Sequence, residues 1–228
     1  MTEAFQITVV IPTLNEAAHL PALLACLAEA GDELTLIVSD GGSTDGTENI
    51  ARAAGAQFVT GAPGRGAQLS RGIAAAATPW LLLLHADTAF PSGWRETLRQ
   101  TLATASTGCA YYGKLRFAST DPRARLLECA VALRCALFRL PYGDQGLLIH
   151  RDLLAAIGGM PQAPLMEDVL LARRLGRQHL APMKLPVITD AAAYARDGWC
   201  RRAAGNLWRL TRFLAGRSAT VLAATYRR

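Results

Sequence analysis

Trp80-Leu81-Leu82-Leu83-Leu84-His85-Ala86-Asp87-Thr88 is the stretch that decides the fold. Its apolar part is too short to cross a bilayer and lacks the polar alternation of a strand with one wet face. We therefore predict the buried central strand of a parallel sheet. His85 and Asp87 follow at the carboxyl end, where open α/β sheets bind ligands, and both can point toward one cation or phosphate. The alternative is a strand that ends in an ordinary polar turn, and this stretch alone leaves the two level.

The composition predicts one folded domain. Of 228 residues, 51% are hydrophobic and 18% are charged, which supports a full core and argues against disorder. The net charge is +6, and because only Lys114 and Lys184 are lysines, the positive charge is nearly all arginine. Arginine suits phosphate, carboxylate or anionic-lipid partners. We expect no nucleic-acid partner, since the chain lacks zinc-ligand spacing, an aromatic–basic repeat and a basic helical arm.

The cysteines and the apolar runs bear on location. Five cysteines are an odd number without CxxC spacing, so we predict neither a disulfide framework nor a zinc site. The first residues lack a basic region and an apolar signal core, and no apolar run reaches the roughly 18 residues of a spanning helix. We expect a cytoplasmic protein that is soluble or bound peripherally at the inner face of the cell membrane.

The first half of the chain alternates strand and helix. We predict strands at 7–11, 34–38 and 57–59, and helices at 16–30 and 47–54. Pro12 is expected to stop the first strand, and Asn15 to cap the helix after it. This β-α-β-α-β order is typical of a nucleotide-binding half-sheet. A small-residue helix at 67–77 precedes the central strand, and a helix capped by Ser92 follows it.

The pattern changes after Gly108. We predict an antiparallel strand at 110–117, a helix at 121–140, strands at 147–150 and 184–189, and between these two strands a helix ending near 176. The expected fold class is α/β, with a mixed sheet flanked by helices in a single domain, 1–228. Within it we distinguish a nucleotide-binding half (1–107), a second half (108–198) and an amphipathic helical annex (199–228).

Acidic residues follow predicted strands or turns at three places, namely Asp40, Asp87 and Glu167-Asp168. The glycine-containing loop after Asp40 suits hydrogen bonds to a base and ribose, and the alternative is an Asx turn that caps the next helix. Arg65, in a Gly-rich loop, could meet a diphosphate. For Arg71, six residues later, we favour a surface salt bridge. Gly64-Arg65-Gly66 is weak evidence by itself, because neither GxGxxG nor GxxxxGK[ST] occurs in the chain.

Taken in order, these pieces resemble the family-2 glycosyltransferases of the GT-A fold. Val10 to Glu16 resembles the family's first-strand signature, and Ser39 to Thr47 its nucleoside loop. His85-Ala86-Asp87 stands where the family carries Asp-x-Asp, and Glu167-Asp168 where it carries an acidic catalytic pair. Three further stretches are similar to a compact bacterial subgroup, the radical-SAM/selenodomain-associated transferases: Gly64 to Gln68, Pro141 to Gly146 and Pro164 to Asp168.

The resemblance implies an inverting transfer of a sugar from a UDP- or GDP-type donor to a hydroxyl acceptor, without an enzyme nucleophile. It implies that residues 108–198 are the acceptor and catalytic half, in which Asp168, beside Glu167, is the catalytic base. It also implies that Asp87 binds a cation that the diphosphate oxygens ligate as well, and that Arg65 lies near the diphosphate. The residues that it places in the nucleotide pocket are Pro12, Thr13, Asn15, Glu16, Asp40, Arg65 and Asp87. The processive Gln-x-x-Arg-Trp pattern is absent, so we expect a non-processive enzyme.

The resemblance also implies a divalent cation, Mn²⁺ or Mg²⁺, bound by Asp87 and His85. His85 departs from the family pattern because it replaces the first aspartate of Asp-x-Asp. An imidazole suits manganese better than magnesium. The expected effect of this departure is on metal affinity rather than on the fold.

On the acceptor side we expect Asp144, Gln145 and Trp199, with Arg201-Arg202 beside the tryptophan, although packing is the simpler role for Trp199. After Trp199 the chain alternates apolar residues with arginines. Such a helix can lie on an anionic membrane, or it can pack on the domain or on a second copy in a homodimer, with its arginines in water. Of these alternatives we favour packing.

Two rival functions remain open. One is a sugar-phosphate nucleotidyltransferase, which would carry a Gly-rich loop with a catalytic Lys or Arg after the first strand. Pro12 to Glu16 occupies that place and disfavours it. The other is a degenerate transferase that binds a nucleotide or a partner without turnover. His85 allows this, whereas the presence of Asp168 argues against it.

Overall fold

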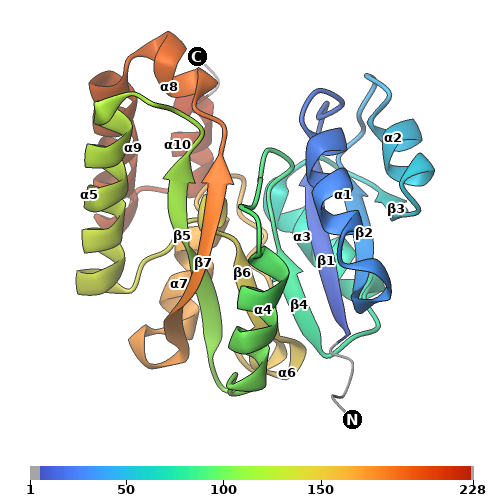
Figure 1. Cartoon of the computed structure of the whole chain (residues 1–228). Helices are drawn as coiled ribbons and strands as arrows, with labels where there is room; N and C mark the ends of the chain where they lie inside the picture. Colours follow the sequence, from blue (N-terminus) through green and yellow to red (C-terminus); the bar gives the residue numbers. More distant parts are fainter. Residues whose placement is uncertain (1–5, 227–228) are drawn as a thin grey trace.

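A single mixed sheet organises the computed structural model, which describes residues 6–226, with side chains as far as residue 222. Its strands are β1 (Ile7–Thr13), β2 (Leu34–Asp40), β3 (Gln57–Thr60), β4 (Trp80–Leu83), β5 (Ala110–Phe117), β6 (Leu147–His150) and β7 (Leu180–Thr189). They lie in the order β3-β2-β1-β4-β6-β5-β7 (Figure 1). Strands β1 to β4 are parallel, β6 is antiparallel to β4 and β5, and β7 is parallel to β5. The predicted mixed α/β sheet is confirmed.

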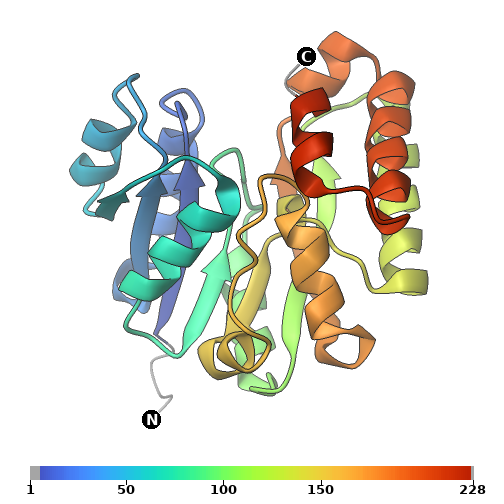
Figure 2. The ribbon, with the colours of Figure 1, turned by 180° about the vertical axis from the view of Figure 1, so that it is seen from behind.

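Helices cover both faces of this sheet. They are α1 (Leu20–Ala28), α2 (Thr47–Ala53), α3 (Arg65–Ala75), α4 (Trp94–Ala103), α5 (Pro122–Phe138), α6 (Arg151–Ala156), α7 (Glu167–Leu175), α8 (Ala192–Asp197), α9 (Trp199–Leu214) and α10 (Ala219–Tyr226). Helices α1 and α4 pack on one face, and α3, α6 and α7 on the other (Figures 1 and 2). Helices α5, α9 and α10 gather beside β5 and β7, at the end of the sheet away from β3.

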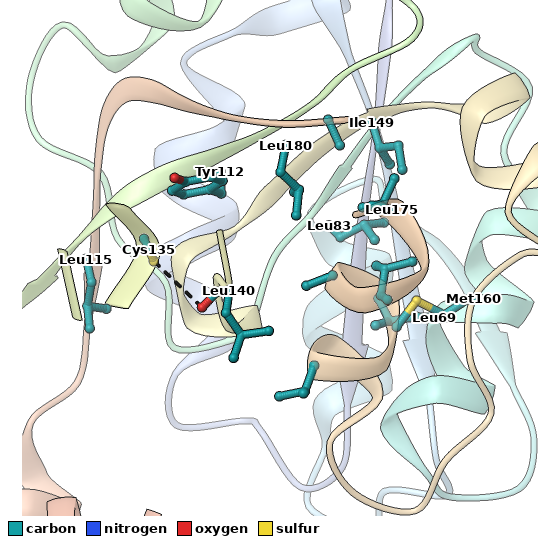
Figure 3. Packing of buried hydrophobic residues seen from close by; sticks show 14 of the residues in the cluster. Leu69, Leu83, Tyr112, Leu115, Cys135, Leu140, Ile149, Met160, Leu175 and Leu180 are labelled. Atoms are coloured by element: carbon teal, nitrogen blue, oxygen red, sulfur yellow. Dashed lines mark hydrogen bonds between the residues drawn. The ribbon is translucent and has the colours of Figure 1, made fainter. Parts of the chain in front are cut away.

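The apolar runs of the central strands are buried on both faces. In β1, Val9 and Val10 are both fully buried, and they point into different clusters because side chains alternate along a strand. Figure 3 shows the cluster on the α3 and α7 side, where Leu83 of β4 packs among Leu69 and Leu175 from these helices. Two covered faces explain why the run 81–84 carries no polar alternation.

Three strand predictions need correction. Strand β1 continues through Pro12 to Thr13. The neighbouring β4 pairs only as far as Val10, so Pro12 belongs to the ladder on the β2 side alone, and its missing N–H is tolerated. Strand β5 is antiparallel to β6 but parallel to β7. The last strand begins at Leu180 rather than at residue 184, ahead of the two prolines within it.

Two predicted helix caps are wrong. Asn15 has a left-handed φ of 56° and lies in the loop before α1, whose N-cap position is occupied by His19. Gly93, with a φ of 81°, takes the N-cap position of α4 in place of Ser92. The helical C-terminal part begins with α8 at Ala192, earlier than the predicted residue 199. Within residues 6–226, no helix is long and apolar enough to span a lipid bilayer.

Candidate active site

A cleft of about 600 Å³ lies at the carboxyl ends of β1 and β4. Its walls also include the start of α3, the turn before β6, the start of α7, the end of β7 and one side of α9. Most of the site residues predicted from the sequence line it, namely Pro12, Thr13, Glu16, Arg65, His85, Asp87, Asp144, Glu167 and Asp168. Residues from distant parts of the sequence are thus brought to one place, as expected at the carboxyl edge of an α/β sheet.

Asp40 lies beneath the wall of this cleft. Its side chain is 2% exposed, and its carboxylate accepts hydrogen bonds from the backbone N–H groups of Gly42 and Ser43 and the hydroxyls of Ser43 and Thr13. Burial opposes ionisation of Asp40, but these hydrogen bonds outweigh it and lower the pKa of the carboxyl. Four donors fill the acceptor positions of a carboxylate, so in this structure Asp40 shapes the loop and orients Thr13.

The loop after β2 is attached to the loop after β1. The side-chain oxygen of Asn15 accepts a hydrogen bond from the backbone N–H of Thr44 at 2.9 Å. Asp45 accepts one from the backbone N–H of Ala17, also at 2.9 Å. Asn15 is exposed and does not line the cleft. Arg71 donates to the backbone carbonyl of Asp40 at 2.7 Å, in place of the surface salt bridge that we favoured.

His85 and Asp87 follow β4 and both face the cleft. Asp87 accepts a hydrogen bond from the hydroxyl of Thr189, at the end of β7, at 2.8 Å. The His85 ring lies against Gly143, where a Cβ atom would stand only 2.5 Å from its Nε2. Burial, together with the Arg65 charge, lowers the pKa of His85 to about 3. The imidazole is therefore neutral, the form that binds metal ions.

Asp144 has a buried side-chain oxygen whose hydrogen-bonding capacity is not satisfied by the described residues. Its Oδ1 atom is buried and has no hydrogen-bond partner among the residues that the structure describes. Burial raises the pKa of Asp144 to about 6, Arg134 opposes the rise, and the nearby carboxylates of Asp168 and Asp87 add to it. A buried carboxylate oxygen without a donor is costly. A divalent cation is one group that would satisfy it, since carboxylate oxygens are the preferred ligands of such ions.

The donor set fits a cation that is shared with a ligand. Within residues 6–226, no three His, Cys, Asp or Glu side chains are grouped closely enough to hold a metal ion by themselves. His85, Asp87 and Asp144 nevertheless line one cleft. Oxygen atoms from a bound diphosphate would have to complete the coordination shell, as is usual for Mg²⁺ sites on nucleotides.

Helix α7 begins with the acidic pair. Asp168 accepts hydrogen bonds from the backbone N–H groups of Gly143, at 2.9 Å, and Val169, at 2.7 Å. Glu167 is 2% exposed and pairs with Arg65 over 3.2 Å. Burial, followed by the adjacent Asp168 charge, raises the pKa of Glu167, while Arg65 works against the rise. Glu167 thus holds Arg65 in the cleft wall, and Asp168 is the less enclosed of the two acids.

Two predicted acceptor residues lie outside the cleft. Gln145 is buried, donates to the backbone carbonyl of Gly113 at 2.9 Å and accepts from the backbone N–H of Tyr142. Trp199 is 5% exposed and stacks on Tyr194 with ring centroids 5.2 Å apart. Both side chains therefore pack the structure instead of facing an acceptor.

On the side of the cleft formed by α9, the sequence reasoning named Arg202 but missed Asn206 and Arg209. Arg202, Asn206 and Arg209 line the cleft, together with Tyr194 of α8. Their spacing of i, i+4 and i+7 is the signal that places three side chains on one helix face. The Nε atom of Arg202 is buried and lacks a hydrogen-bond partner among the described residues, while another nitrogen of this guanidinium donates to Asp197 at 2.8 Å.

Comparison with known proteins finds relatives among the glycosyltransferases. The sequence profile described as glycosyl transferase family 2 matches residues 8–153. An uncharacterized glycosyltransferase of Mycobacterium bovis is 41% identical over 88 residues, which are 38% of this chain and 39% of that protein. The succinoglycan biosynthesis protein ExoA of Rhizobium meliloti is 50% identical over 46 residues, 19% of this chain and 14% of that one. The chain thus matches well under half the length of these curated relatives.

Solved structures are similar over more of the chain. Glucosyl-3-phosphoglycerate synthase from Mycobacterium tuberculosis, in complex with Mn²⁺, UDP and glucosyl-3-phosphoglycerate, is 28% identical with a TM-score of 0.60. The same enzyme with Mn²⁺, UDP-glucose and glycerol 3-phosphate is 28% identical with a TM-score of 0.61. Each similarity covers 80% of this chain and 70% of the other.

Proposed function

The chain belongs to glycosyl transferase family 2, and from this membership we propose that it transfers a sugar from a nucleotide-diphosphate sugar to a hydroxyl acceptor. The observation that carries the proposal is the single cleft that gathers Asp87, Asp144 and Asp168 at the carboxyl edge of the sheet. We further propose that a divalent cation, Mn²⁺ or Mg²⁺, takes part. A similar enzyme of solved structure binds Mn²⁺ with UDP in one structure and Mg²⁺ with UDP in another.

The nucleotide side of the cleft is assigned to the loops after β1 and β2. In this proposal Thr13, held by Asp40, and Glu16 contact the nucleoside. Arg65, fixed by Glu167, faces the diphosphate, whose negative charge grows as the bond to the sugar breaks. Asp87, with His85 and Asp144, would hold the cation, which when bound stabilises that same charge.

We assign the activation of the acceptor hydroxyl to Asp168. Its carboxylate is oriented by the backbone N–H of Gly143, and in this proposal it removes the proton of the hydroxyl that attacks the anomeric carbon. The new bond forms on the face of the sugar opposite the departing diphosphate. A single displacement of this kind inverts the anomeric configuration and requires no covalent intermediate with the enzyme.

We assign an anionic group to the acceptor. Arg202 and Arg209 reach the cleft from α9, and the partnerless Nε of Arg202 supports a further hydrogen bond to an oxygen anion. The similar glucosyl-3-phosphoglycerate synthase has been solved with glycerol 3-phosphate and with phosphoglyceric acid, both of which carry such a group. The identities of the sugar, the nucleotide base and the acceptor are the more detailed parts of this proposal.

Two further assignments, the subgroup of the family and the location in the cell, are proposed from the sequence. The stretch Gly64 to Gln68 supports membership of the radical-SAM/selenodomain-associated subgroup. A cytoplasmic location is supported by the cysteines, which form no disulfide in the described structure.

The test measures donor binding and transfer separately. Calorimetry of a panel of nucleotide diphosphates, with and without Mn²⁺, identifies the base, and the matching nucleotide sugar is then assayed for turnover. Asp168→Asn is expected to keep donor affinity within about twofold and to lose transfer by roughly 10²-fold or more. Asp152→Asn, whose side chain is 83% exposed outside the cleft, is the matched control and should retain activity. An active Asp168→Asn enzyme would refute the assignment of the base.

The same assay separates the rival functions. A nucleotidyltransferase would form a nucleotide sugar from a nucleoside triphosphate and a sugar phosphate. A degenerate transferase would bind the donor, and Asp168→Asn would not change its residual hydrolysis.

A further inference from the structure

Helix α5 exposes an apolar outer face in the part of the chain that the structure describes. From Leu126 to Phe138, every exposed side chain is a leucine, alanine, cysteine or phenylalanine. Leu126 is 74% exposed, Leu133 58% and Phe138 64%. Single exposed leucines are ordinary, but a continuous apolar stripe over four turns of one helix points to an interaction surface.

The neighbouring helix α9 also carries exposed apolar side chains. Helices α5 and α9 contact each other and lie side by side beyond β5 in both views (Figures 1 and 2). On α9, Leu207 is 61% exposed and Trp208 46%. We call the combined surface the α5/α9 face and define it by Leu126, Leu133, Leu137, Phe138, Leu207 and Trp208.

The charged residues of α9 and of the turn after it are all arginines. From Gly198 to Leu222 the sequence contains five arginines and no Asp or Glu, and because Arg202 and Arg209 line the cleft, Arg201, Arg212 and Arg217 remain outside it. The guanidinium of Arg212 lies over the Trp208 ring, 4.6 Å from its centroid. The only acid of α5, Glu128, is buried and paired with Arg116 and Arg125. A symmetric contact between two copies would bring two positively charged surfaces together, which disfavours a homodimer through this face.

We propose that the α5/α9 face binds the surface of an anionic lipid membrane. Leucine, phenylalanine and tryptophan side chains would enter the boundary between head groups and acyl chains, while arginines meet lipid phosphates. At Trp208 the ring would contact the apolar part of the lipid, and the Arg212 guanidinium over it would contact a phosphate. The proposal does not depend on the transfer chemistry, because the six residues of the face lie outside the cleft.

Vesicle co-sedimentation tests the proposal with the full chain. One set of vesicles is pure phosphatidylcholine, and the other contains about one third phosphatidylglycerol. The wild type is expected to bind the anionic vesicles at least roughly tenfold more tightly than the neutral ones, and high salt should weaken this binding. The double variant Leu133→Glu/Leu137→Glu should lower the partition coefficient roughly tenfold or more, because it places two charges in the apolar stripe.

A matched control changes the same net charge elsewhere. Ala22→Glu/Ala25→Glu adds two glutamates to exposed positions of α1, in the other half of the molecule. Its vesicle binding should stay within about threefold of the wild type. Arg212→Ala should weaken binding by roughly fivefold. All variants are checked by circular dichroism and melting, so that unfolding is not mistaken for lost binding.

Three results would overturn the proposal. The first is a wild type that does not bind anionic vesicles. The second is equal loss of binding in the α1 control, which would show that net charge alone matters. The third is a concentration-dependent dimer in light scattering that Leu133→Glu/Leu137→Glu abolishes while vesicle binding is unaffected, which would assign the face to a second copy.

Discussion

Asp144→Asn is predicted to stabilise the protein at neutral and alkaline pH, at the expense of its function. The carboxylate of Asp144 has a buried oxygen without a hydrogen-bond partner in the described structure and two acidic neighbours in Asp87 and Asp168. An asparagine of nearly the same shape cannot ionise, and its amide can donate to a neighbouring carboxylate. The variant therefore removes a source of strain that we attribute to the cation site.

The magnitude follows from the pKa. A rise from 3.8 to about 6 corresponds to roughly 3 kcal/mol when Asp144 is ionised. Below about pH 4 the carboxyl is protonated in both the folded and the unfolded chain, so it contributes no penalty. Between about pH 4 and 6 the unfolded chain releases the proton first, and the free energy of unfolding falls as pH rises. Above about pH 6 the full penalty is present, so the variant should be more stable than the wild type by about 1–3 kcal/mol.

Urea denaturation in the presence of a chelator measures this difference without bound cations. The curves of wild type and Asp144→Asn should nearly coincide near pH 4 and separate near pH 8. Asp152→Asn, an exposed change of the same kind, should show no such separation. A variant that is less stable than the wild type at pH 8, or a difference that does not change with pH, would refute the reasoning. Added Mn²⁺ with nucleotide should stabilise the wild type more than the variant.

Substitutions at four further positions test the packing and the cation site. Glu128→Ala should lower the free energy of unfolding by roughly 2–4 kcal/mol, because it removes the carboxylate that pairs with Arg116 and Arg125 and leaves the buried backbone N–H of Phe117 without its acceptor. Glu128→Gln should cost less, and urea denaturation curves that coincide with the wild type would contradict this account. Gly72→Ala should cost roughly 1–3 kcal/mol, since the new Cβ would lie 2.4 Å from a side chain of β1. In contrast, Gly205→Ala meets nothing nearer than 3.5 Å and should stabilise α9 by up to about 1 kcal/mol. Gly143→Ala should displace the His85 ring and weaken the Mn²⁺-dependent part of nucleotide affinity in calorimetry, an effect that an unchanged Mn²⁺ dependence would exclude.

The sheet could be predicted from the sequence because its signals are local. The apolar runs at β1 and β4 have no polar alternation, and both strands are buried on two faces as this pattern predicts. The predictions were wrong where a residue that is distant in the sequence determines the local structure. Pro12 remains in a strand because β4 stops pairing before it. Asn15 does not cap α1, because its side-chain oxygen accepts a hydrogen bond from the backbone N–H of Thr44. Neither partner is visible from local sequence.

The candidate site likewise contains residues whose position could be predicted from the sequence and residues whose role could not. Asp87 and Asp168 could be predicted because each follows the end of a strand or begins a helix, positions that an α/β fold brings to one edge. Asp40 was also placed at that edge, but the sequence did not reveal that Thr13 and its own loop fill its carboxylate. The role of Glu167 as the partner of Arg65 depends on a contact across 102 positions of the chain, which no short motif reports.

Helix α9 shows why an amphipathic pattern does not determine which face is buried. We favoured packing of its apolar face with the arginines in water. At 3.6 residues per turn, Arg202 and Arg209 fall on one side of the helix and Leu207 and Trp208 on another. The structure turns the first pair toward the cleft and leaves the second pair exposed, while Leu210 reaches the core. One helix therefore presents cations to the candidate acceptor site and apolar side chains to the surface. Substitutions on its two sides can be made separately, so acceptor recognition and vesicle binding can be tested independently of each other.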